Sequence, residues 1–257
     1  MVNVYLSQDL SEVFKLKQLL GLSRSGELGE SHPLQMGFQA AERELAGRNL
    51  STNEREALAR VKMSARIVFQ NEGHWRPVGS RLLSDMLNEE ECRSILFELH
   101  VMTFAVGPVT RDMSWRHYTH ASPDIAASDP DMLVECKLVR SDKLFRIEAK
   151  LEEGRKQHSG LTVPYVIAVG FDHRFNRDEI EEILGLAETL KPWFERHPDV
   201  AAGLIFTPAD PSLPPAKPIH NQLGLPGRVV LHGAVTEVIH HAAANPLPQG
   251  FTFKVIR

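Results

Sequence analysis

Two carboxylates and one ammonium group lie close together in a stretch that otherwise has the pattern of a buried β-hairpin. In residues 122–139, SPDIAASDPDMLVECKLV, Asp124 opens the first expected strand, and Glu135 and Lys137 lie two positions apart in the second. Successive strand residues point to opposite faces, so Glu135 and Lys137 share a face. A buried charge is costly unless it is paired or binds something. The residues therefore form either an internal ion pair beside a turn aspartate or a binding site.

The expected hairpin explains how these groups are brought together. Residues 128–131, Ser-Asp-Pro-Asp, predict a turn, because Asp supplies turn hydrogen bonds and Pro fixes φ. Residues 132–139 form the return strand, whose apolar run is typical of a strand covered on both faces. Asp124 and Glu135 thus lie on adjacent strands.

The chemistry that such groups support is the binding of a hard divalent cation. Mg²⁺ (or Mn²⁺) binds carboxylate and carbonyl oxygens, so Asp124, Glu135 and the backbone carbonyl of Cys136 are candidate ligands. Lys137 is placed to position a water or to stabilise negative charge. Because Lys137 would lie near cations and be partly buried, we expect its pKa to be lowered.

A further acidic residue lies on an otherwise apolar helix. Residues 88–106 predict a helix that is capped by the run from Asn88 to Glu91 and ends at Gly107. Glu98 faces a largely apolar surface of this helix. It either pairs with a core Arg or Lys, or it points into the site of the hairpin.

The spacing of these residues resembles that of the PD-(D/E)XK nuclease superfamily. Pro123-Asp124 is followed eleven positions later by Glu135, and then by Cys136-Lys137. The order of elements also fits, since a helix and a strand at 109–115 precede the two hairpin strands. The similar region covers roughly residues 88–170.

The resemblance implies a fold, a reaction and a set of site residues. The fold would be an α/β restriction-endonuclease-like core, with a mixed central β-sheet flanked by helices. The reaction would be hydrolysis of phosphodiester bonds in nucleic acid, DNA ahead of RNA, with Mg²⁺ (or Mn²⁺) as cofactor. The implied catalytic residues are Glu98, Asp124, Glu135 and Lys137, and the implied metal ligands are Asp124, Glu135, Cys136 and Glu98.

A second copy of the motif competes with the first. Pro130-Asp131 followed by Glu148-Ala149-Lys150 also has the PD…ExK form. We expect a helix in this region, because a strand at 144–151 would leave too little chain for the crossover that a parallel connection needs. On a helix, Glu148 and Lys150 diverge and the second motif loses its meaning.

Charge leaves two classes of function open. The formal net charge is −4, so there is no global attraction to nucleic acid. Residues 137–156 are locally basic, which fits phosphate contact or a plain solvated helix face. The alternative to a nuclease is a catalytically inactive nuclease-fold protein that binds nucleic acid or protein. His117 and His120 point to opposite faces of a strand, so a structural or substrate-contacting role is expected for them rather than a shared metal.

The rest of the chain predicts two regions. Residues 1–75 form a helical extension without a convergent polar cluster, in which Gly21 ends the first helix. Ser51-Thr52-Asn53-Glu54 predicts a capping box for a later helix that ends at Gly73. Residues 76–257 form the α/β core.

The second half of that core has alternating strands and helices. Buried strands are expected at 163–170 and 201–206. A helix that begins near Asn176 lies between them, and Pro192 and Pro198 bracket its end. This alternation predicts parallel pairs of strands.

Composition indicates the size of the core and the cellular compartment that we expect for the protein. The 257 residues are 42% apolar, which is enough for a sizeable core. The two cysteines fit a reducing compartment, and the N-terminus lacks the pattern of a signal peptide. We expect a soluble, cytoplasmic protein that does not bind membranes, with a homodimer left open.

Overall fold

The protein consists of two compact units. The computed structural model describes residues 8–23, 27–107, 110, 112–118, 123–140, 146–157, 163–171, 186–206 and 235–238. The units are Met1–Leu99 and His100–Arg257. The sequence pattern instead places the end of the helical extension near residue 75, and that finer boundary stays a prediction. No helix in the described ranges is long and apolar enough to cross a membrane.

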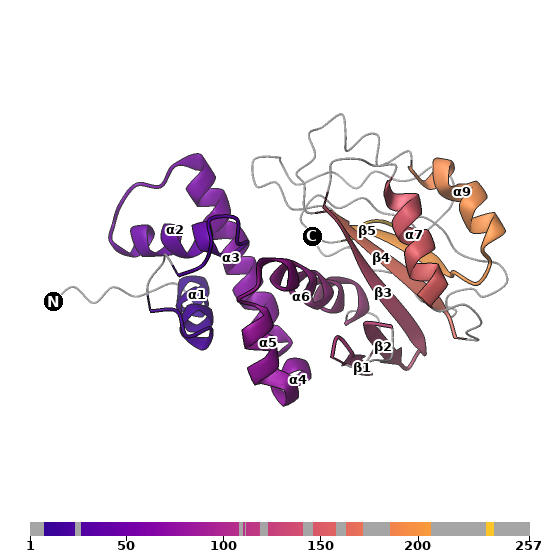
Figure 1. Ribbon diagram of the computed structural model, residues 1–257, viewed down its shortest axis with the longest axis horizontal. Helices are drawn as coiled ribbons and strands as arrows, with labels where there is room; N and C mark the ends of the chain where they lie inside the picture. Colours follow the sequence, from indigo (N-terminus) through magenta and orange to yellow (C-terminus); the bar gives the residue numbers. More distant parts are fainter. Residues whose placement is uncertain are drawn as a thin grey trace. The chain divides into compact units, whose positions relative to one another are not determined.

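The first unit is built from helices (Figure 1). Apolar side chains such as Leu16, Phe38 and Val61 form its core and are almost completely buried. The elements are α1 (Gln8–Leu19), α2 (Gln35–Leu45), α3 (Thr52–Gln70), α4 (Glu72–Trp75), the 3₁₀ turn η1 (Arg76–Val78), α5 (Gly79–Asp85) and α6 (Glu89–Val101), the last of which runs two residues beyond the unit.

Helices α2 and α3 approach each other closely at Gly37. A Cβ atom on Gly37 would lie 2.5 Å from Cβ of Val61 and 2.8 Å from the backbone oxygen of Ala57. Such distances are far below van der Waals contact, so the packing of α2 on α3 requires glycine at this position.

Helix ends in this unit follow the local sequence in some places and depart from it in others. The capping box is confirmed, because the Glu54 amide donates to Ser51 Oγ (3.3 Å) and the Ser51 amide donates to a Glu54 carboxylate oxygen (2.7 Å). Gly21, with φ of 71°, follows α1 as expected. The predicted end of the third helix at Gly73 is wrong. Helix α3 ends at Gln70, and Gly73 lies inside α4.

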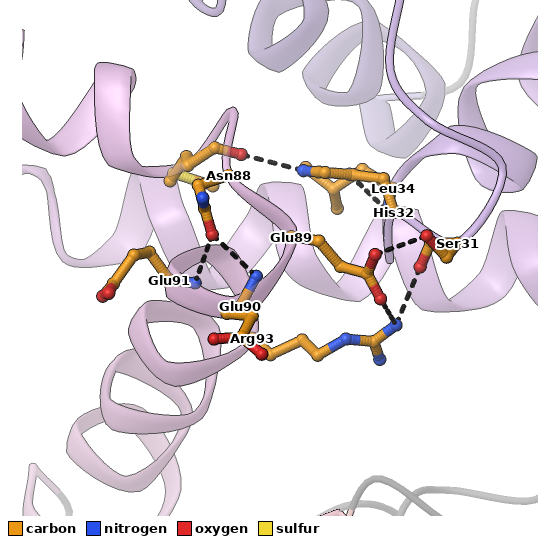
Figure 2. Close-up of polar contacts among 9 residues, drawn as sticks. Ser31, His32, Leu34, Asn88, Glu89, Glu90, Glu91 and Arg93 are labelled. Carbon is orange, nitrogen blue, oxygen red and sulfur yellow. Dashed lines mark hydrogen bonds and ion pairs between the residues drawn. The ribbon is translucent and has the colours of Figure 1, made fainter.

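The start of α6 is held by a side-chain cap, as the sequence predicts (Figure 2). The amides of Glu90 and Glu91 donate to Asn88 Oδ1 at 3.0 and 3.3 Å. Three acidic residues occupy the first turn, where the helix dipole favours negative charge. Arg93 donates to Glu89 at 3.0 Å one turn further on.

A buried histidine joins the loop before α2 to the segment before α6 (Figure 2). His32 is 5% exposed; its Nε2 lies 3.0 Å from the Met86 carbonyl oxygen, and its Nδ1 accepts from the Leu34 amide at 3.3 Å. Arg93 donates to the Ser31 carbonyl at 2.8 Å. With Nδ1 accepting, the ring is in its neutral form, and burial lowers the pKa of His32.

The second unit is an α/β structure with a mixed sheet, which confirms the coarse fold prediction. Among the described residues the sheet has six strands in the order β1-β2-β3-β4-β5-β6. The first three form an antiparallel meander, β3, β4 and β5 are parallel, and β6 is antiparallel to β5. The strands are β1 (Asp112–Trp115), β2 (Ile125–Ser128), β3 (Met132–Val139), β4 (Tyr165–Phe171), β5 (Ala202–Phe206) and β6 (Val235–Val238).

Two helices cover one face of this sheet (Figure 1). They are α7 (Arg146–Gln157), which connects the parallel strands β3 and β4, and α9 (Leu186–Arg196). Ile147 and Leu151 of α7, and Trp193 and Phe194 of α9, join one apolar cluster with β4 and β5. The helix that we expected instead of a strand at 144–151 is therefore confirmed as α7.

The end predicted for the helix before β5, between Pro192 and Pro198, is confirmed, because α9 ends at Arg196. Pro192 lies inside α9, which continues to Arg196. A proline costs an amide hydrogen bond in a helix, yet the buried side chains on either side of it, Leu190 and Trp193, hold α9 on the sheet. The predicted start near Asn176 lies outside the described residues.

The second unit begins within α6. This helix passes directly into a π-helical turn, η2 (Met102–Val106). The ring of His100 meets Phe206 of β5 edge-on, with centroids 5.7 Å apart.

Candidate active site on the hairpin

The strand register aligns three charged residues in one row across the sheet. Ile125 pairs with Val134, so continuing the antiparallel register by one residue sets Asp124 opposite Glu135. The Arg116 amide donates to the Asp124 carbonyl at 2.7 Å, which continues the pairing of β1 with β2. Directly opposite residues share a face of a sheet. Arg116, Asp124 and Glu135 therefore lie on one face, and Arg116 was not among the residues predicted for the site.

Asp124 is anchored by the neighbouring strand. Its Oδ2 accepts a hydrogen bond from the Cys136 amide at 2.7 Å. Burial and the nearby charge of Glu135 raise the pKa of Asp124 to about 6, although the Cys136 amide, Lys137 and His117 oppose the shift. The carboxyl group thus titrates close to neutral pH, as catalytic groups often do.

Glu135 and Lys137 form an ion pair within the strand. Lys137 Nζ lies 2.5 Å from Glu135 Oε1, and the two side chains are only 12% and 3% exposed. Glu153 of α7 lies 3.9 Å from the same ammonium group. Burial alone would lower the pKa of Lys137, but Glu135, Asp124 and Glu153 raise it. The expected lowered pKa of Lys137 is therefore wrong, because carboxylates surround the ammonium group.

A buried tyrosine borders the same face. Tyr165 of β4 is 2% exposed and donates its hydroxyl hydrogen to the Gly154 carbonyl at 2.9 Å. This bond ties α7 to the sheet. Burial, followed by the charges of Glu135 and Asp124, raises the pKa of Tyr165, so it stays neutral and donates.

Three aromatic rings gather where β1 ends. The rings of Trp115 and His117 are stacked, with centroids 5.3 Å apart and planes 19° apart. Tyr118 meets both rings edge-on, at 5.6 and 4.7 Å. The sequence offered no pattern for this cluster, because a turn rather than a regular strand brings residues 117 and 118 onto Trp115. His120 lies outside the described residues.

The donor set fits a hard cation held partly by the main chain. Among the described residues no group of three or more His, Cys, Asp and Glu side chains is arranged to hold a metal. Burial and the facing carboxylate of Glu135 raise the pKa of Asp124, so a cation between the two carboxylates would relieve their repulsion. Asp124 and Glu135 supply carboxylate oxygens of the kind that Mg²⁺ prefers, and the Cys136 carbonyl stays a predicted third donor.

Glu98 belongs to the other unit. It lies on α6 and is 5% exposed, in agreement with its expected position on an apolar helix face. Its predicted role beside the hairpin stays a prediction.

The second PD…ExK motif is not assembled. Asp131 is exposed in the hairpin turn, and Glu148 is exposed on α7, where it lies 3.6 Å from Arg196. Lys150 pairs with Glu153 of its own helix at 2.7 Å.

The basic segment that contains α7 is also neutralised locally. Arg155 and Lys156 both lie near Glu152, at 2.9 and 3.7 Å. Such pairs along a helix surface are typical of a solvated face.

No family model, curated protein or solved structure matches this chain. The arrangement of Asp124, Glu135 and Lys137 is therefore the ground for inferring a function.

Proposed function

We propose that this protein is a metal-dependent nuclease with a restriction-endonuclease-like core, which hydrolyses phosphodiester bonds and acts on DNA ahead of RNA. One observation carries the proposal. Asp124 and Glu135 face each other across β2 and β3, and an ammonium group lies 2.5 Å from Glu135 on the same face. A purely structural hairpin gains nothing from two opposed carboxylates in a region removed from water.

The residues of the row have separable tasks in this proposal. A bound Mg²⁺ (or Mn²⁺) would acidify a water and neutralise charge on the phosphate. Asp124 and Glu135 would hold it, and the Cys136 amide fixes the orientation of Asp124 by its 2.7 Å hydrogen bond. Lys137 would move from Glu135 toward a phosphate oxygen or the attacking water. Glu98 is proposed as a further acidic group.

A second candidate is a nuclease-fold protein without catalysis that binds nucleic acid or protein. The Glu135–Lys137 ion pair favours it, since two charges that neutralise each other can serve structure alone. The two candidates differ in whether a divalent cation binds and whether a phosphodiester bond breaks.

Cleavage assays test the proposal directly. The purified chain is incubated with plasmid, single-stranded DNA and RNA, in Mg²⁺, Mn²⁺ or EDTA. We expect cleavage only with a metal, and a loss of orders of magnitude in Asp124→Asn, Glu135→Gln and Lys137→Met. Circular dichroism verifies that each variant is folded at the assay temperature.

Matched controls come from the second motif. Asp131→Asn and Glu148→Gln change exposed carboxylates and should leave cleavage intact. Loss of cleavage in these two variants alone would move the site. Absence of cleavage by the unmodified protein with every metal and substrate would favour the interaction protein.

Measurements of metal binding distinguish the role of the two carboxylates from that of Lys137. Titration with Mn²⁺, followed by calorimetry, should show weakened binding in Asp124→Asn and Glu135→Gln. Lys137→Met should bind at least as well, because an ammonium group competes with the cation. Equal binding by all four proteins would rule out a cation between Asp124 and Glu135.

A further inference from the structure

The ammonium group of Lys137 lies between two carboxylates that differ in their environment. Glu135, on the same strand, has a side chain that is 3% exposed, and its Oε1 accepts a hydrogen bond from Lys137 Nζ at 2.5 Å. Glu153, on α7, has a side chain that is 48% exposed, and its Oε1 lies 3.9 Å from the same nitrogen, at the outer limit of an ion pair. Lys137 therefore has one close partner in the interior and a second, more distant partner near solvent.

The packing of α7 brings Glu153 within reach of Lys137. Val169, which pairs with Lys137 across β3 and β4, belongs to the same apolar cluster as Leu151 of α7, so α7 covers this face of the sheet. The residue after Glu153 is Gly154, whose carbonyl accepts the hydrogen bond from the Tyr165 hydroxyl at 2.9 Å. The position of Glu153 is thus set by the packing of its helix rather than by its contact with Lys137.

The two oxygens of the Glu153 carboxylate contact two different ammonium groups. Lys150, one turn earlier on α7, donates to Glu153 Oε2 at 2.7 Å, whereas Oε1 is the oxygen that approaches Lys137. A carboxylate has acceptor sites on both oxygens, so it can bind both groups at once. The contact with Lys150 therefore leaves Oε1 available for a closer approach of Lys137.

We propose that Glu153 is a positioning residue for Lys137, to which the ammonium group moves once Glu135 no longer holds it. The event that frees the ammonium group, engagement of Glu135 by a divalent cation, rests on the proposed function. Without a second carboxylate nearby, Lys137 would be left as an unpaired cation at 12% exposure, which is costly. Movement toward Glu153 keeps the charge paired and brings it closer to solvent, from which a phosphate would approach.

The first test needs no metal and is carried out in EDTA. Urea unfolding of Lys137→Met, Glu153→Gln and the double variant gives the coupling energy between Lys137 and Glu153, once with Glu135 present and once in the Glu135→Gln background. Glu135→Gln removes the charge that holds the ammonium group, as engagement by a cation would. We expect the coupling energy roughly to double in this background, because a contact at 3.9 Å becomes a charge-assisted hydrogen bond.

A matched control and a check on folding accompany this test. Glu148 is another exposed carboxylate of α7, and it lies 3.6 Å from Arg196, so Glu148→Gln should show no coupling to Lys137 in either background. If Glu135→Gln/Glu153→Gln does not fold but folds once Lys137→Met is added, the unpaired ammonium group is the cause and the inference is supported. If neither folds, Glu153 serves the fold independently of Lys137 and the inference fails.

The second test measures the affinity for Mn²⁺ by calorimetry. Glu153→Gln should weaken binding roughly three- to fivefold, because Lys137 then remains on Glu135 and competes with the cation. The same substitution should have no effect in the Lys137→Met background. A structural role of Glu153, or a long-range attraction between its charge and the cation, would instead weaken binding equally in both backgrounds.

The outcomes separate this inference from the nuclease proposal. An unchanged coupling energy, or equal weakening of Mn²⁺ binding with and without Lys137, would overturn the role of Glu153 even if metal-dependent cleavage is observed. A larger coupling energy in the Glu135→Gln background would support it even if no metal binds and no substrate is cleaved.

Discussion

At the scale of single residues, the protein keeps two opposed carboxylates in a region where charge is costly. Asp124 and Glu135 lie across from each other, and burial together with Glu135 raises the pKa of Asp124 to about 6. Above that pH the folded protein carries a charge that the unfolded chain would solvate better. The site therefore costs stability when it is empty of cations, a common property of functional sites.

Removing the charge of Asp124 should stabilise the fold. At pH 8 we expect Asp124→Asn to raise the free energy of unfolding by roughly 1–3 kcal/mol, because a raised carboxyl pKa destabilises the folded state above it. The penalty is fully present above about pH 6 and disappears as the pH falls toward the ordinary value of 3.8. Urea unfolding at pH 8 and pH 4.5 measures the difference. Asp131→Asn, in the exposed turn, should change stability at neither pH, and a loss of stability in Asp124→Asn at pH 8 would contradict the prediction.

Removing the charge of Lys137 should destabilise the fold, in contrast to removing the charge of Asp124. In Lys137→Met, Glu135 at 3% exposure would lose the ammonium group beside it and would have to remain as an unpaired charge or take up a proton, so we expect a loss of roughly 3 kcal/mol or more. The double variant Glu135→Gln/Lys137→Met removes both charges and should recover most of that loss. Urea unfolding of the two single variants and the double variant gives the coupling energy. Additive losses would show that the pair does not interact.

At the scale of elements, helix α7 keeps the residues of the second PD…ExK motif apart. It connects two parallel strands and buries Ile147 and Leu151 against them, and Tyr165 fixes it by a hydrogen bond to Gly154. A Cβ atom on Gly154 would lie 3.1 Å from the Ile167 side chain, so the helix lies unusually close to β4. Glu148 and Lys150 of the second motif thus lie on a helix, whereas its Asp131 lies in the hairpin turn.

Close helix packing gives a prediction for the first unit. Gly37→Ala should lower the free energy of unfolding by roughly 1–2 kcal/mol, because the gain in helix propensity is smaller than the cost of forcing α2 from Val61 and the Ala57 backbone. Gly73→Ala in α4 is the control, since nothing lies within 4 Å of the added atom. Thermal unfolding should show a lower midpoint for the first variant and an equal or higher one for the second. Equal midpoints for both would show that the helices separate at little cost.

At the scale of the whole molecule, acid should act through histidines that are buried or partly buried. Burial lowers the pKa of His32, His74 and His100, the last to about 3. Each binds a proton less readily in the folded protein than in the unfolded chain, where histidine is protonated below about pH 6.5. Their contribution to stability is therefore complete above pH 6.5 and is lost as the pH falls.

His100 offers the clearest test. As the pH falls from about 6 to 4, proton uptake by His100 in the unfolded chain should remove roughly 1.4 kcal/mol of stability per pH unit. Asp124 contributes a slope of opposite sign in nearly the same range. The comparison is therefore made in the Asp124→Asn background, with and without His100→Leu. We expect the slope of unfolding free energy against pH to be shallower with leucine. Parallel slopes would show that His100 is protonated in the folded protein.

Features that depend on residues close together in the sequence could be predicted from the sequence alone. The capping box at Ser51, the Asn88 cap and the glycine after α1 depend on contacts between residues a few positions apart, so they could be predicted. The apolar run of 132–139 and the short crossover before 163–170 were enough to predict strand β3 and helix α7. The pairing of Glu135 with Lys137 on one face followed from strand alternation.

Only the tertiary structure decided what depends on register and on distant neighbours. Arg116 joins the row of Asp124 and Glu135 because β1 pairs with β2 in one register, which no local pattern specifies. The pKa of Lys137 is raised by Glu135 of its own strand, but also by Asp124 and by Glu153 of α7, and Pro192 stays inside α9 because its neighbours are buried in the core. Local sequence sets the preference of each segment, but long-range packing outweighs that preference wherever the two conflict.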